Sequence, residues 1–139
     1  MAPVQTVDRM LVAVHDDLDA LAHAAAGQAA AALRQAVAAR GVAHAMFATG
    51  NSQREFVDAL VAGGGVPWSD IVVFHMDEYV GVGPDHPAGF QRWIRERIVD
   101  RTRPRAAHYL DGLADADDEA ARYARLLACL LYTSDAADE

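Results

Sequence analysis

Apolar and polar stretches alternate along the chain in a way that predicts short strands and amphipathic helices. Three apolar runs, at 10–14, 42–48 and 71–74, are short and bounded by polar or turn residues, and we expect each to form a strand. The run 71–74 contains no polar position, which is typical of a parallel strand covered on both faces. The residues 107–110 predict a further short strand.

Four segments between these runs have the spacing of helices with one apolar side. They are residues 18–40, 53–62, 90–100 and 114–127. Asp16 and Asp17 suit the start of the first helix and Gly41 its end, and the last helix is acidic at its start, which suits the helix dipole. Because strands and helices alternate, the predicted fold class is α/β with a mainly parallel sheet.

Composition narrows the class of protein. The 139 residues are 53% hydrophobic and 23% charged, which indicates one globular domain. The net charge of −8 and the absence of a basic cluster argue against nucleic-acid binding. The single Cys129 excludes an internal disulfide framework and a multi-cysteine zinc site. No signal peptide is evident and the Ala-rich stretch 18–39 is too polar to span a membrane, so we expect a cytoplasmic protein.

A polar turn follows the run 42–48. Ligands of open parallel sheets bind beyond the carboxyl ends of the strands, so this turn is a candidate binding site. Its residues are Thr49, Gly50, Asn51 and Ser52. Gly50 permits a close backbone approach, the following helix start offers unpaired N–H groups, and Thr49 and Ser52 add hydroxyl donors. Two interpretations stay open: a phosphate-binding loop, or a helix start capped by Asn51 or Ser52.

The adjacent carboxylates of Asp77 and Glu78 follow the run 71–74. Side chains alternate along a strand, so we expect one carboxylate to face the cleft and the other to hold neighbouring backbone or substrate. A partly desolvated carboxylate there would suit a general base for carbon-bound protons. The alternative is a solvated turn, against which the apolar neighbours Tyr79 and Val80 argue.

A metal site formed by His75, Asp77 and His86 is a weaker interpretation, because the usual spacing of three or four ligands is not evident. The remaining histidines have no partners by spacing and are expected at the surface or packed in the fold. They are His15, His23, His44 and His108.

The two polar clusters, in this order and separation, resemble the glucosamine-6-phosphate deaminase (isomerase) family. The matching segments are Phe47–Gln53, Trp68–Gly81, Asp85–Pro87 and the helix through Phe90 and Trp93. The most specific phrase is Met-Asp-Glu-Tyr-Val-Gly at 76–81. The related 6-phosphogluconolactonases typically carry Asp-Glu-Arg where this chain has Asp-Glu-Tyr, which favours the amino-sugar branch.

The resemblance implies a Rossmann-like parallel sheet with helices on both faces, and conversion of glucosamine 6-phosphate to fructose 6-phosphate and ammonia. Asp77 matches the family's base, which moves a proton between C2 and C1 of the opened sugar, and Glu78 matches its supporting neighbour. The turn Thr49–Ser52 matches the loop that holds the sugar phosphate, although Asn51 stands where many members have a second glycine. The implied partner is a small-molecule sugar phosphate, with no metal or organic cofactor and no nucleic-acid or membrane partner. A homo-oligomer is expected of the complete protein.

Two features of the family are absent from the sequence. The motif Asp-Gly-His, whose histidine opens the sugar ring, does not occur, and Asp111-Gly112-Leu113 lacks that histidine. All 12 basic residues are arginine, so the family's phosphate-binding lysine is also absent. We therefore expect residues 1–128 to be the N-terminal portion of the family's domain, with the C-terminal part of the fold missing and little or no turnover. Residues 129–139 resemble translated sequencing-adapter DNA and are expected to be a non-native tail; the alternative is a native polar tail.

Two alternative functions stay open. A 6-phosphogluconolactonase-like hydrolase would hydrolyse the phosphorylated lactone without releasing ammonia from the amino sugar. A non-catalytic regulator would bind the sugar phosphate without turnover.

Overall fold

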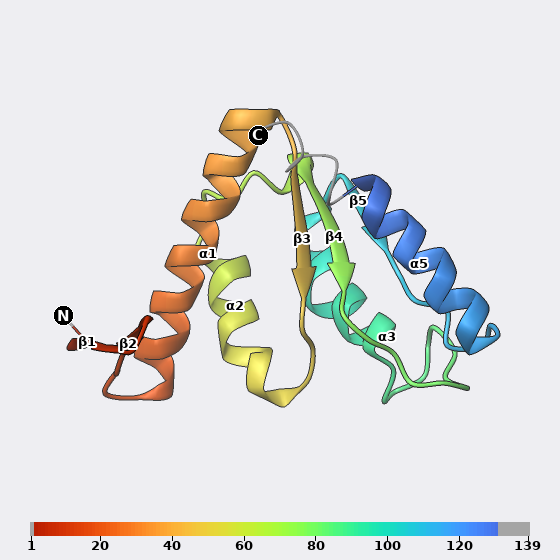
Figure 1. Ribbon diagram of the computed structural model, residues 1–139, viewed down its shortest axis with the longest axis horizontal. Coiled ribbons are helices and arrows are strands. Elements are labelled where there is room, and N and C mark those ends of the chain that lie inside the picture. The colour runs from red at the N-terminus through yellow and green to blue at the C-terminus, as the bar shows by residue number, and fades with distance from the viewer. Residues whose placement is uncertain (1, 131–139) are drawn as a thin grey trace.

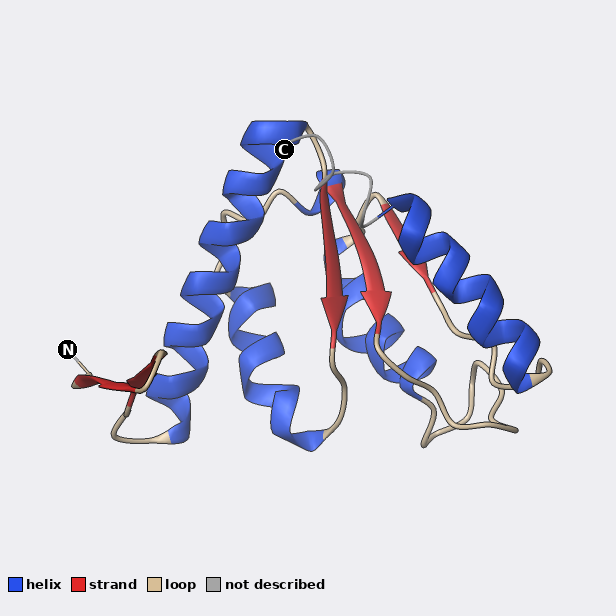
Figure 2. Ribbon diagram, in the orientation of Figure 1, coloured by secondary structure: helices blue, strands red, loops and turns tan. Residues whose placement is uncertain are grey.

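The computed structural model describes residues 2–130 and contains a three-stranded parallel sheet with helices on both faces (Figures 1 and 2). A separate two-stranded hairpin precedes it. The elements are β1 (Val4–Val7), β2 (Met10–Ala13), α1 (Leu18–Arg40), β3 (Ala43–Phe47), α2 (Arg54–Ala62), β4 (Ile71–His75), α3 (Phe90–Ile94), α4 (Asp100–Thr102), β5 (Ala106–His108) and α5 (Ala116–Leu130). Short 3₁₀ turns occupy Asn51–Gln53 and Trp68–Asp70, and a π-helical segment, Arg95–Val99, joins α3 to α4.

The sheet has the strand order β3-β4-β5, and both strand pairs are parallel. Phe47 pairs with His75 at the ends of β3 and β4, and Phe74 pairs with His108 at the end of β5. The carboxyl ends of all three strands therefore lie at one edge of the sheet. This edge is the lower one in Figure 2, where the arrows of β3 and β4 point.

Strand β4 divides the core into two layers. Ile71 and Val73 pack with residues of α1, α2 and the helical segment 90–99 on one face, whereas Val72 and Phe74 pack with Tyr123 of α5 on the other. Every residue of β4 is buried, which explains why its sequence shows no polar alternation. The predicted α/β class with a parallel sheet covered on both faces is thus confirmed.

Helix α1 begins and ends where the sequence predicts. The Asp17 carboxylate accepts a hydrogen bond from the Ala20 N–H at 2.8 Å, and Gly41 ends the helix in the left-handed conformation at φ 76°. The buried side of α1 consists of alanines spaced four residues apart, at 22, 26 and 30, which lets α2 pack closely beside it (Figure 1). No helix within residues 2–130 combines the length and apolarity needed to cross a membrane.

Three elements differ from the sequence-based expectation. The predicted strand 10–14 forms β2, but it pairs antiparallel with β1 and lies outside the parallel sheet, beside the start of α1 (Figure 1). The helix expected at 90–100 extends to Thr102 and includes a π-helical turn. Helix α5 continues to Leu130 and so includes Cys129, the first residue of the expected non-native tail. The rest of that tail, 131–139, lies outside the described residues.

Candidate active site at the carboxyl edge of the sheet

The two polar clusters predicted from the sequence follow neighbouring strands. Phe47 and His75 are paired across β3 and β4, and the Met76 N–H donates to the Phe47 carbonyl oxygen at 3.2 Å just beyond that pair. Thr49 and Asp77 each come two residues after the paired position. The structure therefore brings the predicted phosphate loop and the predicted base to the same edge of the sheet.

The turn after β3 adopts a backbone conformation that favours glycine. Gly50 has φ 101° and ψ 178°, a region that residues with a Cβ rarely occupy. Asn51–Gln53 then form a 3₁₀ turn that leads into α2. Neither Asn51 nor Ser52 caps this helix start with its side chain; the Ser52 Oγ instead accepts a bond from the Gln53 side chain at 3.4 Å. Within residues 2–130 the first N–H groups of the turn therefore remain available to a ligand.

Asp77 and Glu78 lie in a loop, because β4 ends at His75. The expected alternation along a strand is therefore wrong for this pair. Asp77 is exposed, as are Tyr79 and Val80, so the expected partial desolvation is not observed either. Among the described residues the Asp77 carboxylate makes no hydrogen bond or ion pair, which leaves it available to a bound molecule.

The Glu78 carboxylate has a different task. It accepts hydrogen bonds from the N–H groups of Tyr79 at 2.9 Å, Phe90 at 3.0 Å and Gln91 at 2.8 Å. The last two N–H groups belong to the first turn of α3, so Glu78 caps that helix across the intervening loop. The Glu78 carboxylate therefore holds neighbouring backbone, which is one of the two roles expected for this pair, while the Asp77 carboxylate is exposed.

His75 is fully buried, and both of its ring nitrogens are engaged by the protein. Nδ1 lies 2.9 Å from the Asp77 carbonyl oxygen, and Nε2 accepts the Leu110 N–H at 3.0 Å. Burial lowers the pKa of His75 below its usual value, against the smaller opposing effects of the Asp77 carbonyl bond and the Glu78 and Asp77 charges. The interpretation of His75 as a metal ligand is wrong in this geometry, because neither nitrogen is available. Over residues 2–130 no group of three metal-ligating side chains occurs.

An ion pair missed by the sequence analysis fixes the segment between β5 and α5. Glu119 is buried, binds the Arg122 guanidinium at 2.5 Å and accepts the Asp111 N–H at 2.8 Å, while Arg122 also donates to the Tyr109 carbonyl oxygen at 2.8 Å. The Arg122 hydrogen bonds lower the pKa of Glu119 to about 2. The acidic start of α5 indicated only a helix-dipole effect, and nothing in its spacing separates Glu119 from its exposed acidic neighbours.

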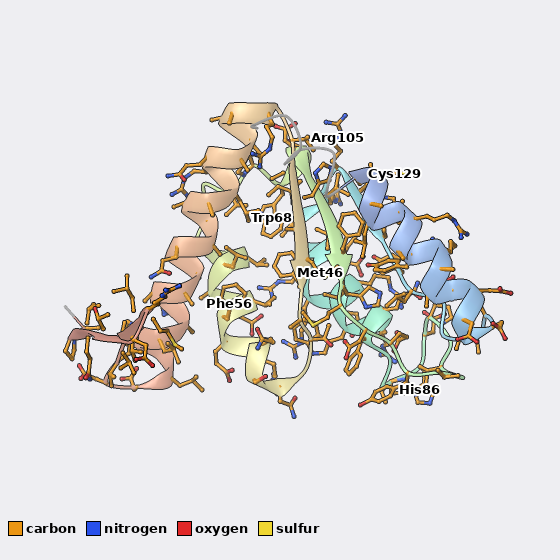
Figure 3. All side chains as sticks on the ribbon, in the orientation of Figure 1. Met46, Phe56, Trp68, His86, Arg105 and Cys129 are labelled. Atoms are coloured by element: carbon orange, nitrogen blue, oxygen red, sulfur yellow. The ribbon has the colours of Figure 1, made fainter. Side chains whose placement is uncertain are left out.

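The loop after β4 is held against this segment by its backbone. The Gly81 N–H donates to the Gly112 carbonyl oxygen at 2.6 Å. A cavity of about 170 Å³ lies between the loop after β4 and the segment that leads from β5 into α5. Glu78, Tyr79 and Asp111 form part of its lining. His86 lies at the outer end of the loop (Figure 3), where its Nδ1 accepts the Ala88 N–H at 3.1 Å.

Comparison with known sequences finds one family over most of the chain. The family model described as "Glucosamine-6-phosphate isomerases/6-phosphogluconolactonase" matches residues 16–138. A glucosamine-6-phosphate deaminase from Streptococcus uberis is 32% identical over 104 residues, which are 73% of this chain and 44% of the relative. A glucosamine-6-phosphate deaminase from an Exiguobacterium species is 35% identical over 60 residues, 42% of this chain and 24% of the relative. The chain spans less than half the length of these curated relatives.

Solved structures share the fold. A 6-phosphogluconolactonase from Shewanella baltica matches with a TM-score of 0.75 and 26% identity, over 84% of this chain and 50% of the other. A monomeric glucosamine-6-phosphate deaminase matches with a TM-score of 0.73 and 20% identity, over 84% of this chain and 49% of the other. The predicted Rossmann-like α/β arrangement is therefore found in members of both branches.

Proposed function

We propose a function from the premise that the chain belongs to the family of glucosamine-6-phosphate isomerases and 6-phosphogluconolactonases, whose model matches residues 16–138. The proposed substrate is glucosamine 6-phosphate, which the complete protein converts with water to fructose 6-phosphate and ammonia. The observation that supports this assignment is the exposed carboxylate of Asp77, which has no partner within residues 2–130, beside a turn with available N–H groups. Curated relatives named glucosamine-6-phosphate deaminase favour the amino sugar.

The turn Thr49–Ser52 is proposed to bind the phosphate. Gly50 keeps the backbone in a conformation that exposes the N–H groups of the following turn, and the helix dipole favours an anion there. Thr49 and Ser52 supply hydroxyl donors. Asn51 is exposed and its side chain makes no hydrogen bond among the described residues, so both its backbone N–H and its amide group are available to the phosphate.

Asp77 is proposed to be the base. In the open-chain sugar its carboxylate takes the proton from C2, and the electron pair of that C–H bond forms the C1–C2 double bond. The π electrons of the C1 carbonyl pass to O1, which takes a proton from the substrate's own C2 ammonium group, and the product is an enaminol. The same proton, returned to C1, leaves an imine at C2, which water hydrolyses to the ketone and ammonia. Glu78 takes no part in this transfer, because its oxygens are occupied by backbone N–H groups.

We expect little or no overall turnover from this chain, because it lacks the family's ring-opening histidine and lysine. The proton transfer is therefore tested on its own. Fructose 6-phosphate and ammonium in D₂O should exchange a C1 proton for deuterium, as detected by NMR. Asp77→Asn should abolish this exchange, whereas Asp118→Asn, an exposed carboxylate on α5, should not change it. Equal exchange in wild type and Asp77→Asn would contradict the assignment, and rapid ammonia release from glucosamine 6-phosphate would contradict the expected inactivity.

A lactonase acting on a phosphorylated sugar acid is the second candidate, since the Shewanella baltica lactonase shares 26% identity. Hydrolysis of 6-phosphogluconolactone without C1 exchange would favour it. Binding of the sugar phosphate without either reaction would favour a regulator. Homo-oligomer formation and a cytoplasmic location remain predictions from the sequence.

A further inference from the structure

His75 occupies the junction between the sheet and the loop that carries Asp77. It is the last residue of β4, is 0% exposed, and precedes Asp77 by two residues. Its Nδ1 lies 2.9 Å from the Asp77 carbonyl oxygen and its Nε2 lies 3.0 Å from the Leu110 nitrogen. One ring thus connects the loop after β4 to the segment after β5.

The partners of the ring determine its tautomer. The Leu110 backbone N–H is a donor, so Nε2 must accept, and the ring hydrogen must then sit on Nδ1 and be donated to the Asp77 carbonyl. A protonated ring would place two N–H donors against each other at Leu110. The neutral ring is therefore the form that these contacts require.

The backbone of His75 is held by a second side chain. The Tyr123 hydroxyl, from α5, accepts the His75 N–H at 3.1 Å and donates to the His75 carbonyl oxygen at 2.8 Å. On the other side, the Met76 N–H binds the Phe47 carbonyl oxygen of β3. Residues 75–77 are therefore tied to β3, to the segment after β5 and to α5.

We propose that His75 is a positioning residue: through its Nδ1–H it fixes the backbone of Asp77 and leaves the Asp77 carboxylate available to substrate. The proposal deepens the assignment of Asp77 as the base and rests on it for its catalytic meaning. Displacement of a reacting group by about 1 Å costs about 100-fold in rate. Loss of the bond that fixes the Asp77 carbonyl is therefore expected to slow proton transfer by the Asp77 carboxylate.

The tautomer gives a test that needs no turnover. In the ¹⁵N spectrum of the labelled chain at about pH 7, the His75 ring should show the neutral Nδ1–H tautomer that its two partners require. The groups facing it are the Asp77 and Glu78 carboxylates and the rings of Tyr109 and Tyr123. An Nε2–H tautomer, or a ring that carries hydrogens on both nitrogens at about pH 7, would overturn the proposal.

Variants test whether the ring positions Asp77 or only stabilises the fold. His75→Leu removes both ring bonds, whereas His75→Asn retains a donor near the Nδ1 position. His108→Leu is the matched control, because His108 stacks on Phe74 at 5.2 Å and its ring makes no hydrogen bond among the described residues. We expect His75→Leu to lower the C1 exchange rate of fructose 6-phosphate about 100-fold with KM within about twofold, and His75→Asn to recover at least about tenfold of that loss. Both are measured well below the melting temperature of each variant.

Two outcomes would overturn the positioning role. One is a His75→Leu chain that is less stable but exchanges C1 as fast as wild type. The other, which needs no substrate, is an Asp77 carbonyl ¹³C shift and a Leu110 amide exchange rate that are the same in wild type and His75→Leu. If the wild-type chain shows no C1 exchange, the proposed function fails, while the Asp77 and Leu110 signals still decide whether His75 positions the loop.

Discussion

Asp77 and Glu78 show how neighbouring residues of the same chemistry acquire different tasks. Glu78 reaches back to three backbone N–H groups, so its oxygens are occupied by the start of α3 and by its own loop. Asp77 is anchored instead through its carbonyl oxygen, and its carboxylate points to an exposed position. The two side chains have the same chemistry, and their partners make the difference. The carboxylate of Glu78 is occupied by backbone N–H groups, whereas that of Asp77 is left to a substrate.

Gly50→Ala should weaken both the fold and phosphate binding. An added Cβ would meet no atom within 4 Å, so the effect arises from the φ of 101° alone. A side chain in this region costs about 1–3 kcal/mol, and relaxation of the turn would turn the N–H groups away from a ligand. Urea unfolding should show this loss, and calorimetry with glucosamine 6-phosphate should show weaker binding.

Gly27→Ala is the matched control for that change. Gly27 lies in α1, where an added Cβ also meets nothing within 4 Å and the backbone is helical. Alanine there should raise the free energy of unfolding by about 0.5–1 kcal/mol and leave sugar-phosphate affinity unchanged. Unchanged affinity in Gly50→Ala would show that the turn does not bind the phosphate through its backbone.

Glu119 should make the fold less stable in acid. Its pKa is lowered from 4.5 to about 2 by the hydrogen bonds of Arg122, so its stabilising effect is complete above about pH 4.5 and is lost as the pH falls toward 2. Glu119→Gln should lower the free energy of unfolding by about 1.5–3 kcal/mol at pH 7 and leave it nearly unchanged near pH 2. Urea unfolding at both pH values measures the difference. The exposed Asp118→Asn should stay within about 0.5 kcal/mol of wild type at both.

At the scale of elements, the sequence predicts those parts whose causes are local. Asp17 and Gly41 determine the ends of α1 through hydrogen bonds within one turn. Four consecutive apolar residues, 71–74, predict most of β4, because a strand covered on both faces lacks the polar alternation of a half-exposed strand; the buried His75 ends it. The partner of β2 was not predicted, because the residues of β1 are all exposed and no burial pattern distinguishes them from a loop.

The candidate site, like the fold, was predictable where its features are local in the sequence. The glycine, the hydroxyls and the adjacent carboxylates are visible as short motifs after predicted strands. The task of His75 depends on Leu110, 35 residues later, and on Tyr123, 48 residues later, so no spacing rule reveals it. The pairing of Glu119 with Asp111 likewise depends on how the β5–α5 segment folds back, which the sequence pattern does not contain.

The contact between the loop after β4 and the segment after β5 should require glycine at position 112. A Cβ on Gly112 would clash with the carbonyl oxygens of Val82 and Tyr79, and both are backbone atoms that cannot rotate away. Gly112→Ala should therefore separate the two segments and lower the free energy of unfolding by about 1–3 kcal/mol. Gly83→Ala in the same loop would meet Leu113 at an ordinary 3.5 Å, and urea unfolding should show a much smaller loss. An equally small loss of unfolding free energy in Gly112→Ala and Gly83→Ala would mean that the two segments can separate without destabilising the fold.

At the scale of the whole molecule, burial is distributed unevenly. All five residues of β4 are buried between the two layers of helices, and four of the eight largest fully buried side chains belong to it: Phe74, Ile71, His75 and Val73. The hairpin β1–β2 instead exposes apolar side chains such as Leu11 at 75% and Met10 at 65%. The unfolding of the hairpin is therefore expected to be largely independent of the sheet.

Hydrogen exchange should resolve these two parts. An isolated two-stranded hairpin is marginally stable in water, so the amides of β1 and β2 should exchange with little protection. The amides of β4 should exchange only through global unfolding, and their protection should equal the free energy of unfolding measured with urea. Leu11→Ala in the hairpin should change that free energy by less than about 0.5 kcal/mol, whereas Ile71→Ala in β4 should lower it by about 2–5 kcal/mol. Strong protection of the hairpin at low protein concentration would contradict this division, whereas protection that appears only as concentration rises would show that the exposed apolar side chains are covered by a second molecule.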